Sequence, residues 1–179
     1  MAKKRKKKVE PRTVAVIDIG SSAIRMMVAE LRGPGKWRTL EVAELPITLG
    51  RDVFLTGRIS RDSVVQANHI LSSYCELMAG YSVETIRAVG TSALREARNR
   101  HMFLDRIEQR TGIVIDVVEA IYENYLTYTA VRYALKASGR RMGWKNSLIM
   151  EVGGGSTEVL VLRRGRMAAA HTLRIGTIR

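Results

Sequence analysis

The sequence predicts a two-lobed α/β protein, and two observations support that prediction. The first is a change of hydrophobic period. Short apolar runs typical of strands give way, near residue 60, to apolar residues spaced three and four apart, as on one face of a helix. The second is a strand followed by a glycine-rich turn, which occurs at 17–22 and again at 150–157. A supersecondary unit repeated in this way indicates two related lobes facing a cleft.

Three strands open the first lobe. Residues 13–19 form a β-rich run that ends in Gly–Ser–Ser, and 24–31 follow as a second strand. A Gly–Pro–Gly turn at 33–35 leads into a third predicted strand over 37–49. Because short turns join the three strands, we expect an antiparallel meander.

Helices and strands alternate in the rest of this lobe. Apolar residues at helical spacing predict a helix over 60–78, with Ser60 as its N-cap. The later elements are expected, in order, as a strand at 83–89, a helix at 92–110, a strand at 113–118 and a helix at about 120–137.

A shift of composition marks the start of the second lobe. Glycine and basic residues over 138–146 predict a linker, after which a new strand–turn–strand unit begins. Without helices to cover this sheet, we expect an incomplete lobe. The isolated chain is expected to self-associate through it, or to be mobile after about Ser138, and to have little or no activity. Its strands are expected at 148–152, 158–162 and 166–173, and the apolar residues expected to be exposed include Leu148, Ile149, Val159 and Val161. The predicted division is a disordered basic tail over 1–12, a first lobe over 13–137, the linker over 138–146 and the second lobe over 147–179.

Much of the positive charge lies at the N-terminus. The formal net charge is +13, and residues 1–12 hold seven basic side chains but only one acid. Such a segment is expected to be disordered, since its like charges repel one another. It is interpreted either as a solubilising tail or as a segment that concentrates phosphate-rich polyanions. No nucleic-acid-binding module follows it, so specific nucleic-acid binding is not expected.

The composition argues against membrane and secreted classes. No apolar run approaches the ~20 residues that a membrane span needs, and the basic start lacks the apolar stretch of a secretory signal. The single cysteine, Cys75, cannot form an internal disulfide and falls in a helical apolar pattern, so we expect a buried structural thiol. A cytoplasmic protein with no membrane partner is therefore expected.

Both glycine-rich turns have the chemistry of a phosphate site. Each follows an acid at the end of a strand, Asp18 in the first case and Glu151 in the second. Glycine lets the backbone approach an anion, consecutive N–H groups bind phosphate oxygens, and a neighbouring carboxylate can hold Mg²⁺. One Gly–Ser turn would equally fit a plain hairpin, but three glycines in succession add no packing to a strand, which favours a functional role. The candidate phosphate-binding residues are Gly20, Ser21 and Ser22 in the first turn and Gly153, Gly154, Gly155, Ser156 and Thr157 in the second.

Charged side chains near two predicted helix starts are further candidates. Arg95 lies one turn inside the helix that follows Gly90, where it suits an anion, although a solvated arginine would look the same. Glu119 and Glu123 lie four residues apart on one face, so either can point into a cleft. Interaction with the helix dipole is the ordinary alternative for both. The three histidines show no metal-ligand spacing.

From about Thr13 to Arg179, the chain resembles the exopolyphosphatase / guanosine pentaphosphate phosphatase (Ppx/GppA) family of the actin, sugar-kinase and heat-shock chaperone superfold. The motifs that carry the resemblance are 17–22, 56–60, 90–97, 153–158 and 173–179. It implies an actin-like ATPase (ribonuclease H-like) fold with a mixed five-stranded sheet. It also implies Mg²⁺-dependent release of a terminal phosphate from inorganic polyphosphate or guanosine pentaphosphate, in the cleft between the lobes.

The resemblance implies a role for each candidate. The catalytic glutamate of the family falls on or beside Glu123, which would act as the general base. The family's phosphate loops match the two glycine-rich turns, and its phosphate-binding arginine matches Arg95. Asp18, Glu151 and Glu158 take the positions of acids associated with the metal and the water. Glu158 is therefore expected beside Glu123 in catalysis, and Asp18 and Glu151 are expected at the metal.

Several positions depart from the pattern of the family. It usually has Asn where Ser22 stands and often Asp where Glu151 stands. A Ser–Gly pair is common where this chain has Glu–Ala at 119–120, and Tyr122 replaces the first of two glutamates. These departures favour the alternative of a non-catalytic sensor that binds polyphosphate or a phosphorylated nucleotide and signals through lobe closure. An ATP-dependent kinase is a third reading, and a homodimer is the assembly considered.

Overall fold

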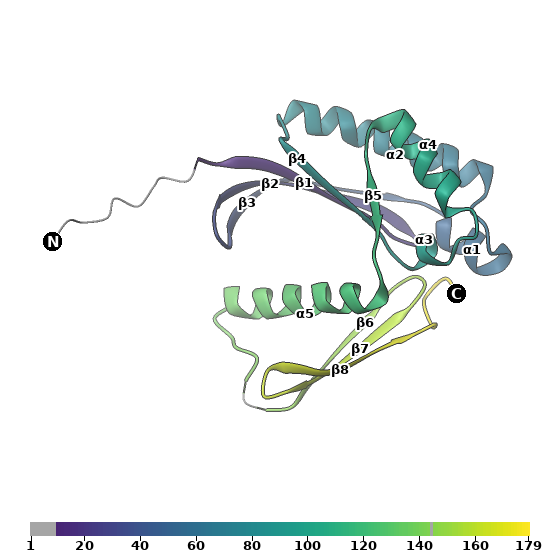
Figure 1. The fold of residues 1–179 in the computed structure, drawn as a ribbon. Coiled ribbons are helices and arrows are strands. Elements are labelled where there is room, and N and C mark those ends of the chain that lie inside the picture. Colours follow the sequence, from purple (N-terminus) through teal and green to yellow (C-terminus); the bar gives the residue numbers. More distant parts are fainter. Residues whose placement is uncertain (1–9, 144) are drawn as a thin grey trace.

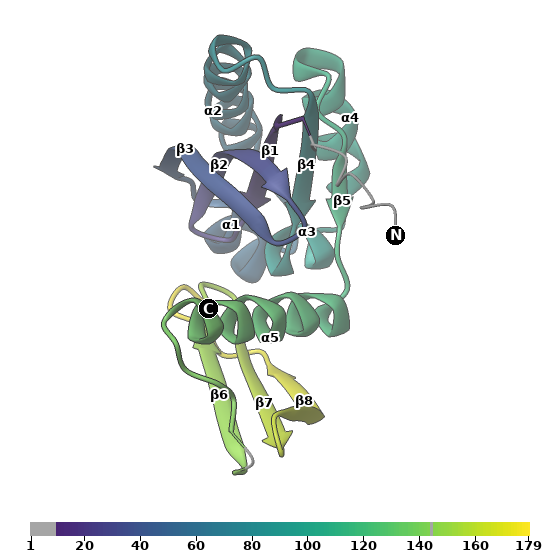
Figure 2. The same ribbon diagram turned by 90° about the vertical axis from the view of Figure 1, so that its left-hand side faces the viewer.

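The computed structural model describes residues 10–143 and 145–179, which form two β-sheets with helices around them (Figure 1). Helix α5 (Ala120–Ala137) lies between the two sheets in both ribbon views (Figures 1 and 2). Of the predicted basic tail, residues 1–9 lie outside the described residues, and Arg12 already belongs to the first strand. No helix in the described part of the chain has the length and apolarity needed to cross a membrane.

The first sheet is mixed and five-stranded, as predicted, in the order β3-β2-β1-β4-β5. Its first three strands pair antiparallel, and the last two run parallel to β1. Inward-facing residues of β1 alternate with outward-facing ones, which is the pattern of a sheet covered by helices on one face. The strands are β1 (Arg12–Ile19), β2 (Ala23–Gly33), β3 (Lys36–Pro46), β4 (Thr85–Gly90) and β5 (Ile115–Val117).

Helices α2 (Arg61–Gly80) and α4 (Arg100–Thr111) cover one face of this sheet (Figures 1 and 2). The buried Tyr74 and Phe103 fill the core, and the Tyr74 hydroxyl donates to the Ile24 carbonyl at 2.8 Å. Ser60 is the N-cap of α2, as predicted, because its hydroxyl accepts a hydrogen bond from the Ser63 backbone at 3.1 Å.

Two predicted elements of this lobe were wrong, and tertiary contacts explain both. The third strand ends at Pro46, and residues 49–56 form helix α1 (Leu49–Thr56), whose Gly50 N–H donates to the Ser21 carbonyl at 2.8 Å. The helix predicted over 92–110 is divided into α3 (Ser92–Glu96) and α4. It breaks because the Asn99 side chain donates to and accepts from the backbone of Ile59, at 2.9 and 2.8 Å.

The second sheet is an antiparallel meander of three strands in the order β6-β7-β8. Helix α5 packs on one face through Tyr128, against Leu160 and Leu162. The same helix contacts the first lobe, where Tyr133 stacks on Trp37 at 4.5 Å between ring centroids. The division of the lobes at residue 137 therefore stays a prediction, because α5 contacts both sheets. The strands are β6 (Ser147–Val152), β7 (Thr157–Arg163) and β8 (Arg166–Leu173).

The repeated turn has the same geometry in both lobes. The Gly20 N–H donates to the Ala23 carbonyl at 3.0 Å, and the Gly153 N–H donates to the Ser156 carbonyl at 2.8 Å. Each bond encloses a two-residue turn between antiparallel strands, so the repeat seen in the sequence is also structural.

Candidate active site

A cleft of about 600 Å³ lies where the two glycine-rich turns meet. The turn after β1 and the turn after β6 form part of its wall, and the start of α5 closes another part. Eleven predicted site residues line it: Asp18, Gly20, Ser21, Ser22, Glu123, Glu151, Gly153, Gly154, Gly155, Ser156 and Glu158. Residues far apart in the sequence therefore form a single site.

Neighbouring elements fix the first turn in place. The Ser21 and Ser22 carbonyls accept hydrogen bonds from the backbone of Gly50 and Ile47 at 2.8 and 2.9 Å. The Ser21 hydroxyl shares a buried hydrogen bond with the Ser92 hydroxyl at 3.0 Å. Helix α1, which was not predicted from the sequence, thus helps to fix the turn in place. The turn therefore needs little rearrangement to bind a ligand.

The second turn packs closely against the first lobe. A Cβ atom on Gly155 would lie 2.3 Å from the Phe54 ring and 2.6 Å from the Ser92 hydroxyl. One on Gly154 would lie 3.2 Å from the Ser21 Cβ. Glycine is required here because a side chain would prevent the close approach of the two lobes. This contact fixes the position of one turn relative to the other.

Four carboxylates face the same cleft, and two of them have perturbed protonation. Burial raises the pKa of Glu123, Arg95 opposes the rise, and the nearby Glu158 carboxylate adds to it. Burial likewise raises the pKa of Asp18, with Arg25 opposing the rise and Glu151 adding to it. Burial is the largest physical cause in both cases, and the like charges gathered in the cleft add to it.

Hydrogen bonds orient the three glutamates. One Glu123 oxygen accepts from Arg95 at 3.1 Å, and its other oxygen has no hydrogen-bond partner among the described residues. Glu158, only 3% exposed, accepts from the Ser156 hydroxyl at 2.6 Å. Glu151 accepts from the Thr127 hydroxyl of α5 at 2.7 Å. Each of the three glutamates therefore uses one oxygen in these bonds and has its second oxygen unpaired among the described residues. Glu123, at the start of α5, is the one that an arginine orients.

The donor set of the cleft fits a hard divalent cation such as Mg²⁺. Mg²⁺ prefers oxygen ligands, retains several waters and usually takes only one or two carboxylates from the protein. Asp18 and Glu151 lie close enough to raise the pKa of Asp18, a repulsion that a cation would relieve. Within the described ranges, no three His, Cys, Asp or Glu side chains form a complete cage. These two residues could therefore hold a cation shared with a bound phosphate.

Two predicted phosphate-binding residues do not line the cleft. The buried Thr157 donates its hydroxyl to the Ile175 carbonyl at 2.7 Å, so it supports the backbone after β8. Arg95 reaches the site only through Glu123 and lines an adjoining cavity. Neither residue lines the cleft, and the phosphate-binding role expected for each stays a prediction.

Arg25 lines the cleft but was missed by the sequence reasoning. It lies 3.5 Å from Asp18 and donates to Glu44 at 2.9 Å. A signal was present, because a two-residue turn after Gly20 places Arg25 opposite Asp18 in the hairpin. The same register places Glu158 opposite Glu151 in the second lobe.

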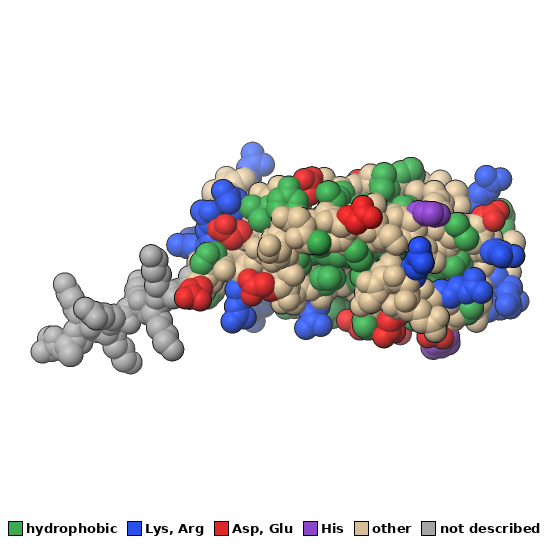
Figure 3. Space-filling view, turned by 90° about the horizontal axis from the view of Figure 1, so that it is seen from above, with side chains coloured by type: hydrophobic (Ala, Val, Ile, Leu, Met, Phe, Trp, Pro, Cys, Tyr) green, Lys and Arg blue, Asp and Glu red, His purple; other side chains and the backbone are tan. Residues whose placement is uncertain are grey.

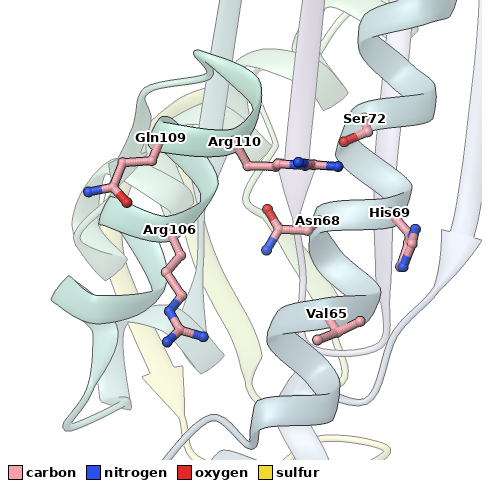
Figure 4. A pocket seen from close by; sticks show the side chains of 7 residues that line it. All are labelled: Val65, Asn68, His69, Ser72, Arg106, Gln109 and Arg110. Atoms are coloured by element: carbon pink, nitrogen blue, oxygen red, sulfur yellow. The ribbon is translucent and has the colours of Figure 1, made fainter.

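Another cavity, of about 400 Å³, lies between α2 and α4 (Figure 4). Arg110 extends from α4 toward α2, where Asn68 and His69 lie, and Arg106 also lines the cavity. Seen from above, the helical face carries charged side chains of both signs among apolar ones (Figure 3). None of the predicted site residues lines this cavity, so it is separate from the cleft.

Two lobes, each opened by a hairpin whose glycine-rich turn faces the other across a carboxylate-lined cleft, define the actin-like ATPase (ribonuclease H-like) fold. Within that class, the chain belongs to the Ppx/GppA phosphatase family, whose family model matches residues 35–179. A solved Aquifex aeolicus member of the Ppx/GppA family is 31% identical, with a TM-score of 0.77, over 94% of this chain and 53% of that one.

Two curated relatives have names that indicate their activities. A guanosine-5'-triphosphate,3'-diphosphate pyrophosphatase of Aliivibrio fischeri is 29% identical over 94% of this chain. Exopolyphosphatase 2 of Mycobacterium tuberculosis is 27% identical over 93% of this chain. The chain spans 32% of the length of the first relative and 53% of the second.

Proposed function

We propose that this chain forms the phosphate-handling part of a phosphoanhydride hydrolase that releases terminal phosphate from inorganic polyphosphate or guanosine pentaphosphate. The observation that carries the proposal is the meeting of two glycine-rich turns and four carboxylates in one cleft, with an unpartnered Glu123 oxygen among them. The names of the two relatives supply the two substrates. A cytoplasmic location fits the lone cysteine, Cys75.

In this mechanism the two turns bind the terminal phosphoryl group. Backbone N–H groups of the turns and the Ser21 hydroxyl donate to its oxygens, which carry most of the charge in phosphoryl transfer. Because both turns are fixed by packing before the ligand arrives, they stabilise that charge with little reorganisation. Bound Mg²⁺, held by Asp18 and Glu151, would supply neutralisation of phosphate charge.

Glu123 acts as the general base on the attacking water. Its free oxygen takes a proton from the water, whose oxygen bonds to the terminal phosphorus. The bridging P–O bond then breaks, and its electron pair leaves with the remaining phosphate chain. Burial raises the pKa of Glu123 above the usual 4.5, which makes it a stronger base, while Arg95 holds it in orientation. Glu158 supports the same region through its bond with Ser156.

The test is phosphate release from polyphosphate and from guanosine pentaphosphate by the protein produced from its native gene. We expect Glu123→Gln to lower the rate by ~10²–10⁴-fold, because the base is lost, and to leave substrate binding nearly intact. The wild-type rate should fall as the pH is lowered, with an apparent pKa above 4.5, because the base must be ionised to accept a proton.

The matched control is Glu119→Gln, which removes an exposed carboxylate at the N-cap of α5, four residues before Glu123 and outside the cleft. It should leave the rate unchanged. Retained activity in Glu123→Gln would transfer the role of base to Glu158. Tight binding of both substrates without phosphate release by the wild type would instead support the sensor, which the departure at Tyr122 and the Arg95–Glu123 ion pair favour.

A further inference from the structure

A second polar cavity adjoins the cleft at Ser156. It has a volume of about 540 Å³ and is lined by Arg95, Glu96, Ala120, Ser156, Thr172 and Arg174. Ser156 lines the cleft as well, so the β6–β7 turn separates two neighbouring cavities. Four parts of the chain meet there: α3, the start of α5, this turn and the end of β8 with the residue after it.

Among the described residues around this cavity, one cation has no ion-pair partner. Arg95 is paired with Glu123 at 3.1 Å, and Glu96 is paired with Arg179 at 2.6 Å. Arg174 makes no ion pair with any described residue and is exposed to solvent. The cavity therefore carries a net positive charge, at a point next to a cleft lined by carboxylates.

The free hydrogen-bonding groups are mainly donors. Arg95 uses one nitrogen, Nη1, for its bonds to Glu123 and to the Val118 carbonyl, so Nε and Nη2 have no partner in the described part of the chain. The Thr172 oxygen accepts from Asn124 at 3.2 Å, which leaves its O–H free to donate. Guanidinium and hydroxyl donors around a polar cavity are suited to phosphate oxygens.

We propose that this cavity binds a second phosphoryl group beside the one in the cleft, and that Arg174 is the residue that recognises it. The inference rests on the proposed function, because the first phosphate site is the cleft. None of the described residues that line the cavity is aromatic, so this lining offers no stacking surface for a nucleobase. The bound group is either the neighbouring phosphate of a chain substrate or a free orthophosphate, and both offer the same oxygens to Arg174.

Calorimetric titration of the chain with orthophosphate and with tripolyphosphate tests the proposal. If the second cavity takes a free orthophosphate, we expect the wild type to bind two orthophosphates per chain and Arg174→Gln to bind one. If the cavity instead takes the neighbouring phosphate of a chain substrate, we expect Arg174→Gln to weaken tripolyphosphate binding about 10-fold, because hydrogen bonds from a charged donor are lost. Arg174→Lys keeps the charge without the fork of donors and should restore part of the binding in either case.

The control is Arg163→Gln, which removes the same charge at the far end of β7, next to the turn to β8. It should bind both anions as the wild type does. If Arg174→Gln matches Arg163→Gln in both titrations, the second site does not exist, although the cleft can still bind phosphate. If the wild type binds neither anion, the proposed function fails as well.

Discussion

At the level of single residues, the cleft holds more negative charge than its cations balance. Arg25 is shared between Asp18 and Glu44, and among the described residues only Arg95 is paired with a glutamate of the cleft. Hydroxyl groups, which carry no charge, hold Glu151 and Glu158. Burial is the main cause of the raised pKa values of Asp18 and Glu123, and the surplus carboxylates add to the rise and favour a bound cation.

Asp18→Asn should therefore stabilise the protein at neutral pH. Because the folded-state pKa of Asp18 lies above 3.8, the folded protein binds this proton more tightly than the unfolded chain does. The stability gained in this way is complete below 3.8 and is lost as the pH rises through the folded-state pKa. Asparagine does not ionise and avoids that loss. Since solvent reaches part of the side chain, we expect a small rise in Tm, of about 2 °C.

Thermal unfolding at neutral pH and below 3.8 provides the measurement, and the difference from the wild type should disappear in acid. Asp116→Asn, at an exposed carboxylate of β5 outside the cleft, is the control and should change Tm little at either pH. A lower Tm for Asp18→Asn at neutral pH would show that its bond with Arg25 outweighs the cost of burial.

At the level of elements, the second glycine-rich turn has the strictest steric requirement. Gly155→Ala would force its new methyl group against Phe54 and Ser92, at 2.3 and 2.6 Å before any relaxation. We expect the turn to shift away from the first lobe. A misplacement of ~1 Å can lower the rate of phosphate release by ~10²-fold, and overpacking should cost about 1–3 kcal/mol of stability.

Gly143→Ala is the matched control, because the described atom nearest to its added methyl group would be the Lys145 backbone nitrogen, at an ordinary 3.9 Å. Phosphate-release rates and Tm values of the two variants make the comparison. If Gly155→Ala kept the wild-type rate, close contact between the turns would not be needed for activity.

Elements with a local signal were predictable from the sequence, and those set by distant contacts were not. The helix capped by Ser60 and the paired glycine-rich turns follow from local patterns. Helix α1 forms against the Ser21 turn. The helix predicted over 92–110 is interrupted at Asn99, whose side chain bonds to the backbone of Ile59, 40 residues away in the sequence. Arg25 was predictable in principle, since hairpin register alone places it opposite Asp18.

At the level of the whole molecule, the C-terminal residue joins the two lobes. Arg179 donates to the Gly155 carbonyl at 2.9 Å and lies over the Phe54 ring, with 4.2 Å from its guanidinium carbon to the ring centroid. It also pairs with Glu96. Backbone N–H groups of Thr177 and Ile178 donate to Gly153 and Gly154 at 3.0 and 2.9 Å. The segment after β8 therefore holds the second turn against the first lobe.

The basic N-terminal segment has a separate role to be tested. Deleting residues 2–10 should weaken the binding of long polyphosphate at low salt and barely affect short chains, since only a long chain can reach both segment and cleft. Screening limits the reach of exposed charges to ~8 Å at physiological ionic strength, so the difference should shrink as salt is added. A variant with glutamine at every basic position of 2–10 controls for length. Equal effects on long and short chains would leave only a solubilising role.

The second sheet has an open apolar face on the side away from α5. Its edge strand β6 exposes Leu148, Met150 and Val152, at 57%, 60% and 59%. Alternation along the strand places these three on one face, while Ile149 packs on the other face beneath α5. The exposure predicted for Leu148 is confirmed, and Ile149 is only half-exposed because of that helix. Val159 and Val161 are likewise half-buried.

We expect two copies of this chain to associate through that open face, because apolar surface on an unpaired edge strand is a site of self-association. Leu148→Gln combined with Met150→Gln should shift the chain toward monomer in light scattering, with the dissociation constant raised about 10-fold or more. Leu55→Gln, which removes an exposed leucine from α1, should leave the assembly unchanged. Circular dichroism confirms that each variant is folded. A wild-type chain that is monomeric at high concentration, or a double variant that associates as the wild type does, would show that this face does not drive assembly.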